Sequence, residues 1–151
     1  MQRIAVATWK GGPRAGQGSI STASRVIEHA PYAFASGAHH EACTSPCEML
    51  AAAHASCLSL AIAAELTELD RMPQAVTTEA VYSMDQHEGQ WSVVAAHLDV
   101  LVRINDMGPQ ELQDLVQRAE LLCPITRALN PEIKITLEAR LEPAFALAHS
   151  G

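Results

Sequence analysis

Two of the four cysteines stand in segments where a thiol could do chemistry. Cys57 lies within residues 49–64, none of which is formally charged, and this apolar run predicts a helix that is buried on nearly all sides. Cys123 directly precedes Pro124, and a short helix beginning at this proline would direct its amide dipoles at an anionic sulfur. By this local argument Cys123 is the more reactive thiol of the two.

Cys57 would need a cationic neighbour to react at neutral pH. A cysteine has an ordinary pKa of about 8.5, so only a few per cent is thiolate, and burial lowers that fraction further. Lowering the pKa to about 7 takes roughly 2 kcal/mol of thiolate stabilisation, which one guanidinium and a hydrogen bond can supply. Without such help, Cys57 is a small buried hydrophobe.

Other side chains near Cys57 suggest competing functions. Zinc or another soft metal prefers the ligand types of His39, His40, Cys43, Cys47 and His54. No second Cys-x-x-Cys or His-x-x-x-His pair completes a recognisable spacing, so we predict no metal site; copurifying zinc in stoichiometric amount would reverse this.

His54 stands three positions before Cys57, on the same side of a helix. A cysteine–histidine nucleophile would also need an orienting acid, and none stands at a recognisable place, so we expect His54 to be a hydrogen-bonded core histidine. A non-enzymatic alternative is a pocket around Cys57 that binds an apolar ligand or senses oxidation. Its candidate lining comprises the five methionines with Trp9, Trp91, Tyr32 and Phe34.

Length and charge narrow the class of protein. The 151 residues suit a single domain, 1–151, with a flexible tail at 142–151. The net charge of −7 and the scattered basic residues argue against nucleic acid as a partner. The apolar run is shorter than the ~20 residues of a membrane span, and no secretory signal is visible, so we expect a cytoplasmic protein without membrane partners.

The periodicity predicts an α+β fold built on antiparallel sheets around a long buried central helix. That helix needs cover on every side, which a partner subunit could supply, so we expect a homodimer. Short β-type runs within 3–9 and 18–35 predict a hairpin or meander, and further strands are predicted at 75–84, 91–104 and 133–141. The predicted helices run from 46 to about 69 and from 108–109 onward.

Five further motifs accompany the two cysteine segments between about residues 8 and 141: Trp9-Lys10-Gly11-Gly12, Gly16-Gln17-Gly18, Ser21-Thr22, Pro31-Tyr32-Ala33-Phe34 and Thr44-Ser45-Pro46. In order and spacing this set resembles the family of osmotically inducible protein C and the organic hydroperoxide resistance proteins (OsmC/Ohr). The resemblance implies interwoven dimers with active sites built from both chains. It also implies a thiol peroxidase of oxidative stress defence that reduces organic hydroperoxides without a cofactor. Cys57 would attack the peroxide, Cys123 would resolve the product as a disulfide, and an external dithiol would reduce it.

The sequence departs from the family pattern at the residues that assist the attacking cysteine. The family's glutamate position is Cys47 here, and Glu48, one position later, would be rotated by about 100° on a helix. One branch of the family carries its arginine where this chain has Gly37, and the other carries it in the glycine-rich loop, where Arg14 is our candidate. Arg127, four residues after Cys123, is a second possibility.

These departures leave alternatives open. Our predicted catalytic set is Cys57, Cys123, Arg14 and Glu48. The same fold could instead have weak or no peroxidase activity and act as a ligand-binding, metal-binding or redox-sensing protein. Cys47 could itself be a resolving thiol, since four cysteines allow three complete pairings.

Overall fold

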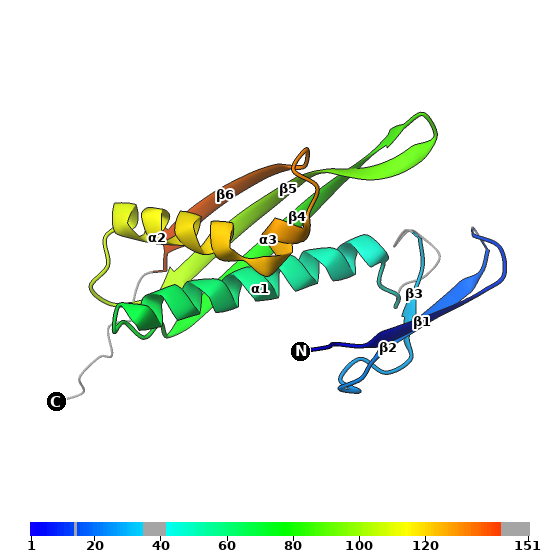
Figure 1. Cartoon of the computed structure of the whole chain (residues 1–151), viewed down its shortest axis with the longest axis horizontal. Coiled ribbons are helices and arrows are strands. Elements are labelled where there is room, and N and C mark those ends of the chain that lie inside the picture. The colour runs from blue at the N-terminus through cyan, green and yellow to red at the C-terminus, as the bar shows by residue number, and fades with distance from the viewer. Residues whose placement is uncertain (14, 35–41, 143–151) are drawn as a thin grey trace. The chain divides into compact units, whose positions relative to one another are not determined.

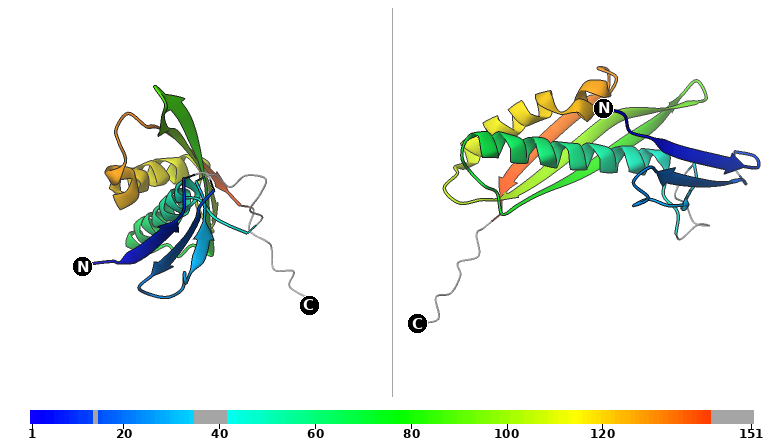
Figure 2. Two further views of the ribbon diagram at one scale, coloured as in Figure 1. Left: turned by 90° about the vertical axis from the view of Figure 1, so that its right-hand side faces the viewer. Right: turned by 60° about the horizontal axis from the view of Figure 1, so that its bottom comes forward.

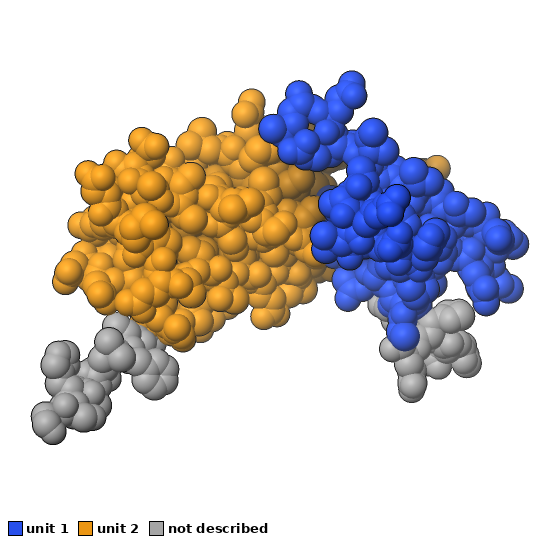
Figure 3. All heavy atoms as spheres, turned by 90° about the horizontal axis from the view of Figure 1, so that it is seen from below, with its two compact units in different colours: residues 1–50 blue, residues 51–151 orange. Residues whose placement is uncertain are grey.

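The computed structural model describes residues 1–13, 15–34 and 42–142. The chain divides into two compact units, residues 1–50 and 51–151, coloured separately in Figure 3. The elements, labelled in Figure 1, are β1 (Ala5–Lys10), β2 (Gln17–Thr22), β3 (Ala30–Tyr32), α1 (Pro46–Glu68), β4 (Ala75–His87), β5 (Gln90–Arg103), α2 (Pro109–Leu122), α3 (Pro124–Ala128) and β6 (Lys134–Leu141).

The first unit contains an antiparallel sheet in the order β1-β2-β3. The rings of Trp9 on β1 and Tyr32 on β3 lie 5.5 Å apart between centroids. They close over Gly18 on β2, where an added Cβ would come within 2.5 Å of Tyr32 and 2.7 Å of Trp9. A glycine is therefore required at this motif position because the two rings fill the space of a side chain.

Helix α1 begins with a capping arrangement. The Ser45 hydroxyl accepts the backbone N–H of Glu48 at 3.2 Å, and the Thr44 hydroxyl donates to Glu48 Oε2 at 2.6 Å. Pro46 occupies the first turn, where its missing N–H costs no intrahelical hydrogen bond. The start at residue 46 that the sequence predicted is thus explained by local chemistry.

The second unit contains the sheet β4-β5-β6, which is mixed rather than antiparallel. Strands β4 and β5 form a hairpin whose two turn residues, Glu88 and Gly89, have φ of 50° and 82°. Strand β6 pairs parallel to β5, from Ala95↔Lys134 to Val102↔Leu141. Our expectation of purely antiparallel sheets was wrong here, because α2 and α3 form the long crossover connection that parallel strands need.

Helices α1 and α2 lie side by side on one face of this sheet (Figures 1 and 2). The core between them is made by three groups of buried residues: Leu58, Ile62 and Leu66 on α1, Leu98, Val100 and Val102 on β5, and Leu112, Leu115, Val116 and Ala119 on α2. Alternate residues of β5 and positions of α2 at helical spacing point into it.

Among the described residues, the fully buried positions of α1 fall on one side of the helix, which differs from the expected burial on nearly all sides. The buried positions are His54, Leu58, Ile62 and Leu66, whereas Leu60 is 72% exposed. One sheet and one helix can cover only one side of a helix that is apolar all round. By length and composition α1 would also suit a membrane span, a test that core helices of globular proteins pass as well.

Candidate functional site

The thiols of Cys57 and Cys123 lie within hydrogen-bonding range of each other. Cys57 on α1 is partly buried, and Cys123, between the end of α2 and the start of α3, is fully buried. Both are free thiols. The fold therefore brings together the two cysteines that the sequence singled out, close enough for one thiol to hydrogen-bond the other.

Burial raises the pKa of the Cys57 thiol above its ordinary value, and the hydrogen bond with Cys123 raises it further. The backbone N–H of Ile125, in the first turn of α3, donates to the Cys57 sulfur and opposes this rise in pKa. The local sequence argument had assigned the α3 amides to Cys123. The structure directs one of them at Cys57 instead, because α3 packs beside α1.

No cation contributes to the thiolate stability of Cys57 among the residues that the structure describes. Arg14 and Gly37, the two family positions for the arginine, lie outside the described residues. Arg127 is exposed and forms no ion pair within the described part of the chain. Among the described residues, the Ile125 backbone N–H is the group that favours the Cys57 thiolate.

Glu48 serves the first turn of α1. Its carboxylate accepts the Thr44 hydroxyl, and a carboxylate at this end of a helix also complements the helix dipole. Nothing in this arrangement requires a reactive cysteine. The contact accounts for an acid at position 48 by helix capping alone.

His54 is fully buried and uses both ring nitrogens. Nδ1 lies 2.8 Å from the Tyr82 hydroxyl on β4, and Nε2 lies 2.9 Å from the Thr126 hydroxyl on α3. Burial lowers its pKa. The expectation of a hydrogen-bonded core histidine is confirmed, and neither nitrogen is available to a metal. The partners Tyr82 and Thr126 were missed, since no local pattern marks them.

Thr126 also hydrogen-bonds Glu120, which lies on the last turn of α2. Burial raises the pKa of Glu120, and the Thr126 hydroxyl opposes this by donating to the carboxylate. Four polar side chains from four elements thus form one chain beside Cys57: Tyr82, His54, Thr126 and Glu120.

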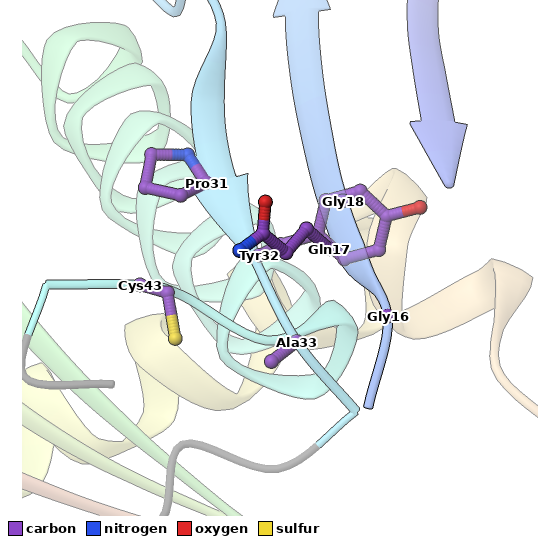
Figure 4. A pocket seen from close by; sticks show the side chains of 7 residues that line it. All are labelled: Gly16, Gln17, Gly18, Pro31, Tyr32, Ala33 and Cys43. Carbon is purple, nitrogen blue, oxygen red and sulfur yellow. The ribbon is translucent and has the colours of Figure 1, made fainter. Parts of the chain in front are cut away.

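Motif residues of the first unit line a pocket of about 250 Å³. Figure 4 shows its lining, with Cys43 in the segment that leads to α1: Gly16, Gln17, Gly18, Pro31, Tyr32, Ala33 and Cys43. The N-terminal motifs are far apart in sequence but meet here. His39 and His40, which the metal alternative needs beside Cys43, lie outside the described residues.

One group of potential metal ligands was not anticipated: His97, Asp99 and Glu138, whose ligand atoms lie within 4.8 Å of one another on the outer face of the second sheet. Arg140 donates to Asp99 at 2.6 Å and lowers the pKa of that carboxyl. His97 Nδ1 is 2.8 Å from the Thr136 hydroxyl. Because Arg140 already pairs with the Asp99 carboxylate, we interpret this group as a surface ion-pair cluster.

Comparison with known proteins identifies consistent relatives. A family model described as OsmC-like protein matches residues 38–138. Peroxiredoxin OsmC of Escherichia coli K12 is 31% identical over 136 residues, covering 90% of this chain and 94% of the relative.

Two solved structures have the same fold. The organic hydroperoxide resistance protein OhrB of Bacillus subtilis is 24% identical with a TM-score of 0.66, covering 91% of this chain and 98% of that one. An OsmC-like protein of Mycoplasma pneumoniae is 11% identical with a TM-score of 0.76, covering 93% and 97%. At these identities the likeness concerns the fold alone.

Proposed function

Because the chain belongs to the OsmC-like family, as its motifs predicted, we propose that it is a thiol peroxidase that reduces organic hydroperoxides to alcohols. The observation that carries the proposal is the facing pair of thiols, Cys57 and Cys123. The peroxiredoxin name of the Escherichia coli relative supports the same class of activity.

In the first step, the Cys57 thiolate attacks the terminal oxygen of the hydroperoxide. A sulfur–oxygen bond forms while the oxygen–oxygen bond breaks, and the leaving alkoxide takes a proton to become the alcohol. Cys57 is oxidised to a sulfenic acid.

In the second step, the Cys123 sulfur attacks the Cys57 sulfenic acid and releases water, which leaves a Cys57–Cys123 disulfide. An external dithiol then restores both thiols by two exchanges and is itself oxidised to a disulfide. The overall reaction converts hydroperoxide and dithiol into alcohol, water and oxidised dithiol. Contact between the two thiols before the reaction supports this resolving role for Cys123.

The raised pKa of Cys57 makes a cation necessary for efficient attack. We assign this role to Arg14, whose guanidinium would stabilise the thiolate and the developing alkoxide. One guanidinium and the Ile125 amide together can supply the roughly 2 kcal/mol that a pKa of about 7 requires.

We propose that the working form is a homodimer in which the exposed side of α1 is covered by the partner. The support is the apolar composition of that side, which includes Leu60 at 72% exposure. Monomeric proteins rarely leave a continuous apolar helix face in water.

A second candidate is a redox sensor or ligand-binding protein on the same fold. The observation that favours it is the high pKa of Cys57 together with the lack of a cation beside it among the described residues. It predicts slow oxidation without turnover.

The test is thiol loss from the reduced protein after stoichiometric cumene hydroperoxide, in the wild type, Cys57→Ser and Cys123→Ser. The proposal predicts rapid loss of two thiols that depends on Cys57, and a persistent sulfenic acid in Cys123→Ser. Slow loss that is indifferent to Cys57 would overturn it in favour of the sensor or binding protein.

A further inference from the structure

The polar chain Tyr82–His54–Thr126–Glu120 is the least expected feature beside the thiols. It places a fully buried histidine in a core otherwise made of Leu, Ile, Val, Ala and Cys123. Burying a polar group is costly unless it is hydrogen-bonded, and here both ring nitrogens are. A leucine could fill this space without that cost, so the histidine is better explained by the groups that its hydrogen bonds hold in place.

The hydrogen bonds along this chain have one consistent direction. The Thr126 hydroxyl has one proton, which it donates to the Glu120 carboxylate, so it must accept from Nε2–H of His54. Nδ1 of the neutral imidazole is then an acceptor, and the Tyr82 hydroxyl donates to it. These proton positions are assigned from the network. Every member is satisfied, so the chain fixes a single geometry.

This geometry ties α3 to α1 next to the thiols. His54 is three residues before Cys57 on α1, and Thr126 is three residues after Cys123. Ile125, whose N–H donates to the Cys57 sulfur, is the residue before Thr126. Helix α3 has only five residues and no fully buried side chain, and its Ile125 packs partly buried against the core.

We propose that His54 is a positioning residue, which through Thr126 holds α3 against α1 and keeps the Cys123 thiol and the Ile125 amide directed at Cys57. The functional importance of this positioning rests on the peroxidase chemistry proposed above. The positioning itself can be tested without a peroxide, by measuring the rate at which the two thiols form a disulfide.

The test is disulfide closure by diamide, an azo oxidant that accepts the two electrons and two protons released when two thiols join. The proteins carry Cys43→Ser and Cys47→Ser, so that Cys57 and Cys123 are the only thiols, and quenched samples are followed by intact mass. Thr126→Val removes the hydroxyl and preserves the side-chain shape. Thr126→Ser restores the hydroxyl, and Thr126→Ala replaces Thr126→Val if that variant does not fold.

The matched control is Thr78→Val. Its hydroxyl lies 2.8 Å from that of Ser59, so this variant also loses one side-chain hydrogen bond to α1, but from β4 rather than α3. We expect closure to slow by about tenfold or more in Thr126→Val, because small misplacements of reacting groups are costly. Thr126→Ser and Thr78→Val should stay within about twofold of the wild type, as for a substitution without a positioning role.

Closure in Thr126→Val within about twofold of the wild type would overturn the proposal, as would equal slowing in Thr78→Val, which would indicate general loosening of the fold. Failure of the proposed function has a different signature: the wild type would close with diamide but would not consume cumene hydroperoxide. Sulfenic acid trapped by dimedone after peroxide treatment of Thr126→Val, with Cys123 intact, would show that resolution and not attack depends on Thr126.

Discussion

Both units of this chain carry motifs of the family, but they differ in how many apolar residues they bury. All the fully buried apolar residues within the described ranges belong to the second unit, from Leu58 to Cys123. The first unit has a three-stranded sheet in which β1 is almost wholly exposed, with Val6 at 63%. A three-stranded sheet needs a covered apolar face for independent stability. The thiols therefore sit on a self-supporting core, whereas the glycine-rich motifs sit on a sheet that needs cover from elsewhere.

The sharpest test of this contrast compares Leu98→Ala in the core of the second unit with Val6→Ala on β1. Leu98→Ala should lower the free energy of unfolding by about 2–5 kcal/mol, since it removes a fully buried side chain and leaves a cavity. Val6→Ala should cost less than about 0.5 kcal/mol in the monomer. Urea unfolding followed by circular dichroism measures both. A cost at Val6 as large as that at Leu98 would mean that the first unit has its own core.

Leu60→Glu tests whether a partner covers α1. A charge at this exposed position should weaken dimerisation by about a hundredfold or more, because a carboxylate would be buried unpaired in the interface. Sedimentation velocity over a concentration series measures the change. Gln117→Glu, at an exposed position on α2 rather than on the open side of α1, is the matched control. A wild type that stays monomeric at all concentrations would remove the proposed dimer.

Arg14→Ala tests whether the first unit activates a thiol held by the second. Attack of Cys57 on cumene hydroperoxide at pH 7 should slow by about ten- to a hundredfold, the factor expected for one or two units of pKa. Arg127→Ala, which removes the second candidate arginine at an exposed position, is the comparison variant. If Arg127→Ala slows attack and Arg14→Ala does not, the assignment passes to Arg127.

The smallest effect concerns the pH dependence of stability through His54. Burial lowers its folded-state pKa below the unfolded value of about 6.5, so the folded protein keeps His54 neutral while the unfolded chain takes up a proton. The stability that this contributes is fully present above about pH 6.5 and is lost as the pH falls below it, with a slope of at most about 1.4 kcal/mol per pH unit.

The measurement is the difference in unfolding free energy between wild type and His54→Gln at pH 7.5 and pH 5.5. It should shrink at the lower pH. His87→Gln, on the exposed β4–β5 hairpin, controls for removal of a histidine. A difference that grows on acidification would mean that His54 is charged in the folded protein.

Local signals in the sequence predicted most elements to within a few residues. Pro46 after Ser45 marks the start of α1, Glu88-Gly89 marks the hairpin turn, and strict alternation marks β6. Each depends on neighbours along the chain, which the sequence shows directly. The motifs also identified the family, and that is confirmed.

Contacts between distant segments could not be predicted in the same way. Alternation in β6 marks a strand but not its partner, so its parallel pairing with β5 was missed. The sequence showed an apolar α1 but not which side the sheet and α2 would leave open at Leu60. It placed His54 in the core without naming Tyr82 or Thr126.

The chain's own order of residues thus determined its helices and strands, its family and the two cysteines worth examining. Only the tertiary structure decided that the Ile125 backbone N–H and the Cys123 thiol are the groups that hydrogen-bond Cys57. The physical reason is that capping, turns and periodicity act over a few residues, whereas burial and hydrogen bonding between α1 and α3 exist only after the core has packed.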